Sequence, residues 1–230
     1  DIYGNYKIIE WITSGKFNVS WSINIDPLSS IMLVVVTIVS SLVHIYSIGY
    51  MENDPKKIIF LGYLGLFTFF MLMLVTSSNL IQLFLGWEGV GLTSYLLIGF
   101  WNKKESANKA ALKAFIINRV GDFGFLLGIF SIFIVFGTVN FNEIFILVDT
   151  QESTYFNFLG VNFHALTLIS ILLFINAFLR VYMLKTESLD TKVIYVIGVR
   201  FIEITGVIGR NVIAVIGVIG TRALEASTDL

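Results

Sequence analysis

The chain has 230 residues, of which 56% are hydrophobic and only 13% are charged, and its formal net charge at pH 7 is -1. Its mean hydropathy of +0.84 is typical of a polytopic membrane protein and excludes an ordinary water-soluble domain. The near-neutral charge, with no long basic stretch, argues against nucleic-acid binding. The lack of cysteine excludes disulfides, iron–sulfur ligation and thiolate metal sites, and two histidines are too few for a histidine-based metal centre.

Six apolar segments are long enough to cross a bilayer, since about 20 helical residues span its hydrocarbon core. They cover residues 28–50, 58–78, 79–101, 111–137, 165–184 and 193–220. We therefore predict an all-α fold, a polytopic transmembrane helix bundle of about six spans. Asp26 and Pro27 predict where the first helix begins, because aspartate is a good N-cap and proline fits the first helical position.

Composition divides the chain into three regions. Residues 1–27 have the features of an interfacial lead-in, with Trp11 and Trp21 as anchors at the membrane surface. Residues 28–175 contain the helices rich in leucine and aromatic side chains. Residues 176–230 form a membrane segment and tail rich in valine, isoleucine and glycine.

The loop lysines predict the orientation. With six crossings, the loops 51–57, 102–110 and 185–192 lie on one side of the membrane and carry seven lysines. The positive-inside rule assigns this side to the cytoplasm or the mitochondrial matrix. The residues before the first helix then face the outside.

Glu88 lies in the middle of the third apolar segment. A carboxylate near the bilayer centre costs at least about 2.5–3.5 kcal/mol, so it is usually kept where it lines a wet path or is buried against other helices. Gly86, Gly89 and Gly91 remove side-chain bulk around it, so helices can pack closely and water or a partner side chain can approach. Glu88 is our first candidate for a protonatable switch, and a packing motif whose acid pairs with a base is the alternative.

The fourth apolar segment supplies three more candidates, Lys113, Arg119 and Asp122. Arg119 and Asp122 are three residues apart and can pair on one helix face, which favours a neutral structural pair. Lys113 lies nearly two turns earlier, where its ammonium group could also snorkel to the interface. Together the three could form the inner end of a polar path that leads to Glu88.

His44, near the inner end of the first segment, is a candidate proton relay because its unperturbed pKa lies near neutrality. Interfacial packing beside Tyr46 and Tyr50 is the alternative. Asn79 and Gln82 are amides within apolar sequence, and we expect them to form hydrogen bonds between helices.

Four stretches, 26–32, 44–51, 86–101 and 113–122, occur in the order and spacing of one family. By these motifs the chain resembles subunit 5 of NADH–ubiquinone oxidoreductase, the antiporter-like membrane subunit of respiratory complex I, over about residues 20–175. The antiporter subunits of multi-subunit sodium/proton exchangers share the same helical core.

The resemblance implies a part in proton translocation coupled to electron transfer from NADH to ubiquinone. It implies that Glu88 matches the membrane glutamate of the family, and that Lys113, Arg119 and Asp122 match polar residues of the following helix. No cofactor is expected on this chain, since FMN and the iron–sulfur clusters belong to other subunits of such a complex. The implied partners are other membrane-arm subunits, a second polypeptide that completes the antiporter-like fold, and lipid such as cardiolipin. The implied location is the mitochondrial inner membrane, with the bacterial plasma membrane as the alternative.

Beyond residue 175 the sequence departs from the family. Arg180 stands where the family has a lysine that partners the glutamate, and an arginine is effectively never deprotonated. The broken helix, histidines and lateral helix of the family do not follow. A structural membrane-arm subunit with a truncated, inactive channel therefore stays open as an alternative, as does a sodium/proton exchanger subunit.

Overall fold

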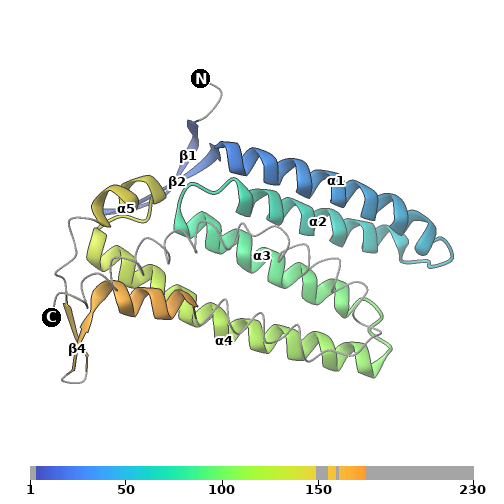
Figure 1. Cartoon of the computed structure of the whole chain (residues 1–230). Coiled ribbons are helices and arrows are strands. Elements are labelled where there is room, and N and C mark those ends of the chain that lie inside the picture. Colours follow the sequence, from blue (N-terminus) through green and yellow to red (C-terminus); the bar gives the residue numbers. More distant parts are fainter. Residues whose placement is uncertain (1–3, 149–154, 159–160, 175–230) are drawn as a thin grey trace.

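The computed structural model describes residues 4–148, 155–158 and 161–174. Four long helices lie side by side (Figure 1): α1 Pro27–Tyr50, α2 Lys57–Val75, α3 Leu80–Ile98 and α4 Glu105–Phe136. Each is long and apolar enough to cross a membrane. The helix α3 packs against both α2 and α4, while α1 packs against α2. A short helix α5, Phe141–Leu147, follows.

The first four predicted spans are thus confirmed as helices. The fifth is helical from Ala165 to Phe174, as far as the structure describes it, and the sixth lies outside the described residues. The helix α4 begins six residues earlier than predicted, at Glu105. Its first turns are polar, so the apolar pattern does not include them. The ion pair between Glu105 and Lys109, at 2.7 Å and four residues apart, stabilises the helix there.

Two β-hairpins add to the all-α fold that we predicted. Strand β1, Gly4–Ser14, pairs with β2, Phe17–Ile25, and β3, Tyr155–Phe158, pairs with β4, Val161–His164, both antiparallel. Gly15 in the first turn has φ of 57°, which glycine adopts without strain. Within the lead-in, Trp11 and Trp21 contact each other edge to face, with ring centroids 5.2 Å apart. Their role as membrane anchors stays a prediction.

The start of α1 confirms the predicted N-cap. The Asp26 carboxylate accepts a hydrogen bond from the Ser29 backbone N–H at 2.6 Å, and the Asp26 N–H donates to the Ser29 hydroxyl at 2.8 Å. This reciprocal capping box satisfies donors that the first helical turn leaves free. The proline at the first helical position then costs no hydrogen bond.

Glycines allow the helices to approach closely. A Cβ atom on Gly86 would lie 2.8 Å from Cβ of Leu74, and one on Gly89 would lie 2.2 Å from the Phe70 ring. Both contacts are with α2, so these glycines let α3 pack closely against α2, as the glycines around Glu88 predicted.

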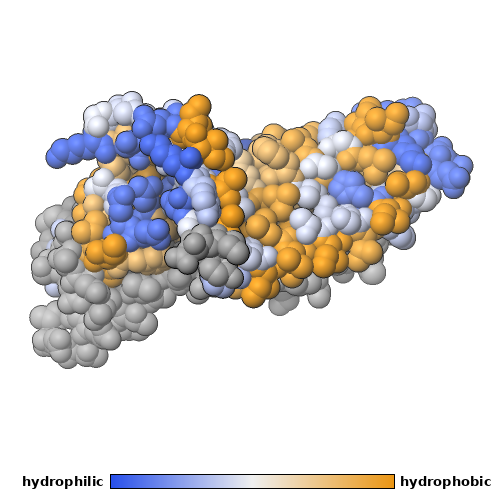
Figure 2. All heavy atoms as spheres, turned by 90° about the horizontal axis from the view of Figure 1, so that it is seen from above, coloured by the Kyte–Doolittle hydropathy of each residue, from blue (hydrophilic) through white to orange (hydrophobic). Residues whose placement is uncertain are grey.

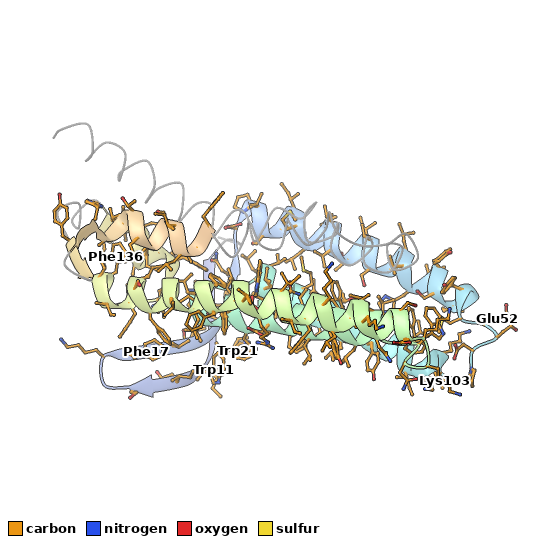
Figure 3. The ribbon with its side chains drawn as sticks, turned by 90° about the horizontal axis from the view of Figure 1, so that it is seen from below. Trp11, Phe17, Trp21, Glu52, Lys103 and Phe136 are labelled. Carbon is orange, nitrogen blue, oxygen red and sulfur yellow. The ribbon has the colours of Figure 1, made fainter. Side chains whose placement is uncertain are left out.

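The two ends of the helix layer differ. The loops that follow α1 and α3 lie together at the end remote from the first hairpin, where Figure 3 labels Glu52 and Lys103. The Trp101 indole N–H donates to the Asp54 carboxylate across these loops at 3.3 Å. Hydrophobic side chains dominate the surface between the hydrophilic ends (Figure 2). Two of the three predicted lysine-rich loops therefore share one end, and the loop 185–192 lies outside the described residues.

The amides of Asn79 and Gln82 fix the first hairpin to the start of α3. The Gln82 amide donates to the Ser22 carbonyl at 2.9 Å and accepts the Ser22 N–H at 3.2 Å. Asn79 donates to the Ser20 carbonyl at 2.8 Å and caps α3 by accepting the Gln82 N–H. Our prediction of hydrogen bonds between helices was wrong, because the partners of both amides are backbone groups of strand β2.

Candidate functional site

Glu88 lies midway along α3 and forms an ion pair with Arg119 of α4, whose guanidinium donates to the Glu88 carboxylate. The Glu88 side chain is 18% exposed and the Arg119 side chain 48%. The pair joins two adjacent membrane helices, so each charge is partly balanced where water is scarce.

Asp122 lies one turn beyond Arg119 on α4 and is buried. Its carboxylate accepts the Trp87 indole N–H at 2.6 Å. The carboxyls of Glu88 and Asp122 are also within interaction range of each other. Arg119 reaches across to α3, and Trp87 donates a hydrogen bond to Asp122. The predicted pairing of Arg119 with Asp122 on one face of α4 stays a prediction.

Trp87 was not predicted as a site residue. Its indole ring is 2% exposed, and a buried indole N–H almost always needs an acceptor. A tryptophan next to a glutamate within an apolar helix was the available signal. The Asp122 carboxylate supplies the acceptor and is held in place in return.

Two aromatic rings lie between the ion pair and the lysine-rich end of the layer. The Arg119 guanidinium lies 4.9 Å from the centre of the Phe115 ring, and Phe115 contacts Tyr95 of α3 at 5.3 Å. A cation over an aromatic face is stabilised by roughly 0.5–2 kcal/mol. Beside Arg119, an apolar hollow of about 390 Å³ opens on α4.

The cluster consists of two carboxyl groups and one guanidinium. With all three ionised its charge is -1, and one bound proton brings it to neutrality. Charge within a membrane is unfavourable, so an arrangement that becomes neutral by binding one proton is suited to hold and release that proton. Among the described residues no group of three or more His, Cys, Asp or Glu side chains is placed to hold a metal ion.

Lys113 and His44 are not part of this cluster. Lys113 is exposed on α4, and its ammonium forms no ion pair within the described part of the chain. His44 is half-buried on α1, where its Nδ1 lies 2.7 Å from the Ser40 carbonyl oxygen. The Ser40 hydroxyl reaches Thr68 of α2 at 2.7 Å, so the polar contacts of His44 lie between α1 and α2. Arg180, which the sequence placed opposite Glu88, lies outside the described residues.

Membrane-length helices that bring an ion-paired glutamate and a buried aspartate together define a polytopic membrane protein with a candidate ion-translocation site. Two family models match the chain. Residues 11–61 match the N-terminus of chain 5 of NADH-ubiquinone oxidoreductase (complex I), and residues 77–186 match the transmembrane region of NADH:quinone oxidoreductase and Mrp antiporter proteins. The chain belongs to this family of complex I chain 5 and antiporter-like membrane subunits.

Individual relatives agree with this assignment. The chain is 60% identical over 170 residues to NADH-ubiquinone oxidoreductase chain 5 of Chondrus crispus, and 57% identical over 170 residues to NADH-quinone oxidoreductase subunit L of Rickettsia typhi. Each match covers 74% of this chain and 26% of the relative, so the chain spans about a quarter of the length of these curated relatives.

Two solved structures share the fold. The Mrp complex of a Dietzia species aligns with a TM-score of 0.62 at 18% identity, over 78% of this chain and 18% of that chain. The archaeal membrane-bound sulfane sulfur reductase aligns with a TM-score of 0.57 at 18% identity, over 84% of this chain and 31% of that chain. The antiporter-like helical fold that we predicted is confirmed.

Proposed function

We propose that this chain is part of a membrane-arm subunit of complex I and takes part in proton translocation coupled to NADH:ubiquinone electron transfer. Glu88 is the protonatable group. Arg119 and Asp122 set the charge around it, and Trp87 positions Asp122. The subunit belongs to a proton-translocating NADH:ubiquinone reductase and itself carries no redox centre.

Two contacts between α3 and α4 carry the proposal: Arg119 forms an ion pair with Glu88, and Asp122 accepts a hydrogen bond from Trp87. The carboxyls of Glu88 and Asp122 also lie within interaction range of each other. These contacts place three ionisable groups within the membrane span of two neighbouring helices, where such groups are functional candidates by default. Lys113 and His44 remain candidates for the inner end of the path, and a proton would need water or further side chains to pass between them and Glu88.

The test is Glu88→Gln in the assembled complex, with the ratio of protons translocated to electrons transferred as the measurement. The amide keeps the shape of the side chain and cannot ionise, so we expect the ratio to fall while NADH oxidation by a soluble acceptor is retained. The matched control is Glu105→Gln, which removes an exposed carboxylate at the lysine-rich end of the same helix layer. An unchanged ratio in the Glu88 variant would contradict the proposal.

A structural role is the second candidate, and the direct pairing of Glu88 with Arg119 favours it, since a paired acid can simply link two helices. A third candidate is a subunit of a sodium/proton exchanger, because the Mrp complex shares the fold. Copurification with flavin and iron–sulfur subunits, and not with small exchanger subunits, would distinguish complex I from the exchanger.

The proposed partners are the other membrane-arm subunits of complex I. Lipid, with cardiolipin as one candidate, surrounds the helices. The proposed location is the mitochondrial inner membrane, with the bacterial plasma membrane as the alternative. Mass spectrometry of every subunit in the purified complex tests for these partners.

A further inference from the structure

A cavity of about 420 Å³ opens at the lysine-rich end of the helix layer, between the first turns of α2 and α4 and the end of α3. Its polar lining consists of one lysine, two tyrosines and two asparagines: Lys56, Tyr63, Tyr95, Asn102 and Asn108. A water molecule takes up about 30 Å³ in the liquid, so the cavity has room for several waters, and these side chains can bond to them. The cavity is therefore suited to bring water into the helix layer from the lysine-rich side.

The ion pair at Glu88 lies deeper along the same two helices. The helices α3 and α4 run in opposite directions (Figure 1), and their contacts follow in order from the cavity inward. At the cavity, a Cβ atom on Gly99 would lie 3.5 Å from Cβ of Ala111. One turn further in, the ring centroids of Tyr95 and Phe115 are 5.3 Å apart. The seven residues from Tyr95 back to Glu88 rise about 10 Å along α3, so this ring pair lies between the cavity and the carboxylate.

The two rings contact both the cavity and the ion pair. Tyr95 lines the cavity, whereas Phe115 lies under the Arg119 guanidinium, 4.9 Å from its carbon atom. Tyr95 also packs against an apolar cluster that contains Ile98 and Ala114. A constriction of apolar side chains excludes water while it is narrow and admits water when the side chains part. The ring pair has the position and the chemistry of such a constriction.

We propose that Tyr95 and Phe115 form an aromatic barrier between the water of this cavity and Glu88, and that parting of the two rings opens the route by which a proton reaches Glu88 from the lysine-rich side. Because the Phe115 ring also supports the Arg119 guanidinium, the movement that admits water loosens the cation that pairs with Glu88. The inference rests on the proposed role of Glu88 as the protonatable group.

The test measures access of water-soluble reagents to position 88 in the assembled complex. The 230 residues contain no cysteine, so in Glu88→Cys mass spectrometry of this stretch detects the introduced thiol alone. A positively charged, membrane-impermeant methanethiosulfonate is added on the lysine-rich side, and its rate is divided by that of uncharged methyl methanethiosulfonate, which corrects for changes in thiol ionisation. Adding Phe115→Ala to Glu88→Cys should raise this ratio at least about tenfold, because removal of one ring opens the constriction.

Four further variants in the Glu88→Cys background test the barrier and the route. Tyr95→Ala removes the other ring and should act like Phe115→Ala, which keeps the test open if one of the two does not assemble. Tyr95→Phe keeps the ring and should leave the ratio unchanged. The matched control is Phe130→Ala, which removes an exposed ring of α4 on the far side of the ion pair. Leu112→Trp adds bulk to the wall of the cavity and should reverse the gain that Phe115→Ala produces.

Three results would overturn the inference. An unchanged ratio in both alanine variants would show that the rings are no barrier, and an equal gain in Phe130→Ala would show a general loosening of α4. A gain that Leu112→Trp leaves intact would show that the reagent arrives by another route. Labelling measures access and not translocation, so it is read separately from the proton ratio of Glu88→Gln: a normal proton ratio there would reject the proposed function, whatever the labelling shows.

Discussion

The first turn and the middle of α3 both carry polar groups within an apolar layer, but the two differ in charge and in how completely they are paired. In the first turn, Asn79 and Gln82 are 0% and 1% exposed and match backbone groups of the hairpin with neutral hydrogen bonds. In the middle, Glu88 pairs with the half-exposed guanidinium of Arg119, and the nearby Asp122 carboxylate accepts the Trp87 indole N–H.

The difference separates a structural junction from a candidate site. The amides of Asn79 and Gln82 do not ionise, and their hydrogen bonds serve structure. Removing one amide leaves a buried backbone group without its hydrogen-bond partner. Two carboxyls beside one arginine can change their total charge by binding one proton. The middle of α3 is therefore where function should be sought, and the first turn is where stability should be lost.

The largest effect should come from Gly86→Leu, which tests whether both regions of α3 depend on the packing of α3 against α2. A side chain there would collide with the backbone of Leu74, whose Cα lies 2.9 Å from the Cβ position. We expect a loss of at least about 3 kcal/mol of stability, at the upper end for overpacking. Thermal unfolding of the purified chain in detergent measures it.

The matched control is Gly62→Leu on α2, where nothing lies within 4 Å of the Cβ position. It should be neutral or slightly stabilising, because leucine is the better helix former. Equal losses in the two variants would show that helix packing is not what Gly86 provides.

The next effect isolates the neutral junction. Gln82→Ala leaves the backbone N–H and carbonyl of Ser22 without their partners, which should cost about 1–3 kcal/mol. Thr93→Val is the comparison, because the Thr93 hydroxyl donates to carbonyls of its own helix, those of Gly89 and Val90, and its loss should cost under about 1 kcal/mol. The same unfolding assay serves both, and proton translocation should not respond specifically to either.

A smaller effect belongs to the ion pair in the middle of α3. A double-mutant cycle with Glu88→Gln and Arg119→Gln should give a coupling energy of about 1 kcal/mol, modest because Arg119 is half exposed. The exposed pair of Glu105 and Lys109 is the control and should give about 0.3–0.5 kcal/mol. No coupling between Glu88 and Arg119 would mean that the pair does not tie α3 to α4.

The smallest effect concerns an exposed pair on the hairpin. The Lys7 ammonium, 2.8 Å from the Glu10 carboxylate, lowers the Glu10 pKa below its usual 4.5 through a hydrogen bond and charge attraction. A depressed folded-state pKa stabilises the fold above the unfolded value, and this contribution disappears as the pH falls through the folded value, below 4.5. An NMR titration of Glu10 should return to the usual pKa in Lys7→Ala; an unchanged titration would remove Lys7 as the cause.

Much of the fold could be predicted because it depends on local sequence. The spans follow from apolar runs, and the start of α1 follows from Asp26 and Pro27, whose effect is confined to the first turn. The hairpin β1–β2 was not predicted, because the tryptophans of the lead-in also fit a membrane interface. The polar start of α4 was missed because it carries no apolar signal.

The sequence by itself determined that this is a membrane protein, which helices cross, which end carries the lysines and that Glu88 is costly to keep. Each of these properties is a sum over neighbouring residues or the chemistry of one side chain. Only the tertiary structure decided that Arg119 pairs with Glu88, that Trp87 holds Asp122 and that Gln82 binds the hairpin. These contacts depend on how far each helix is rotated and shifted against its neighbour, which spacing along a single helix does not fix.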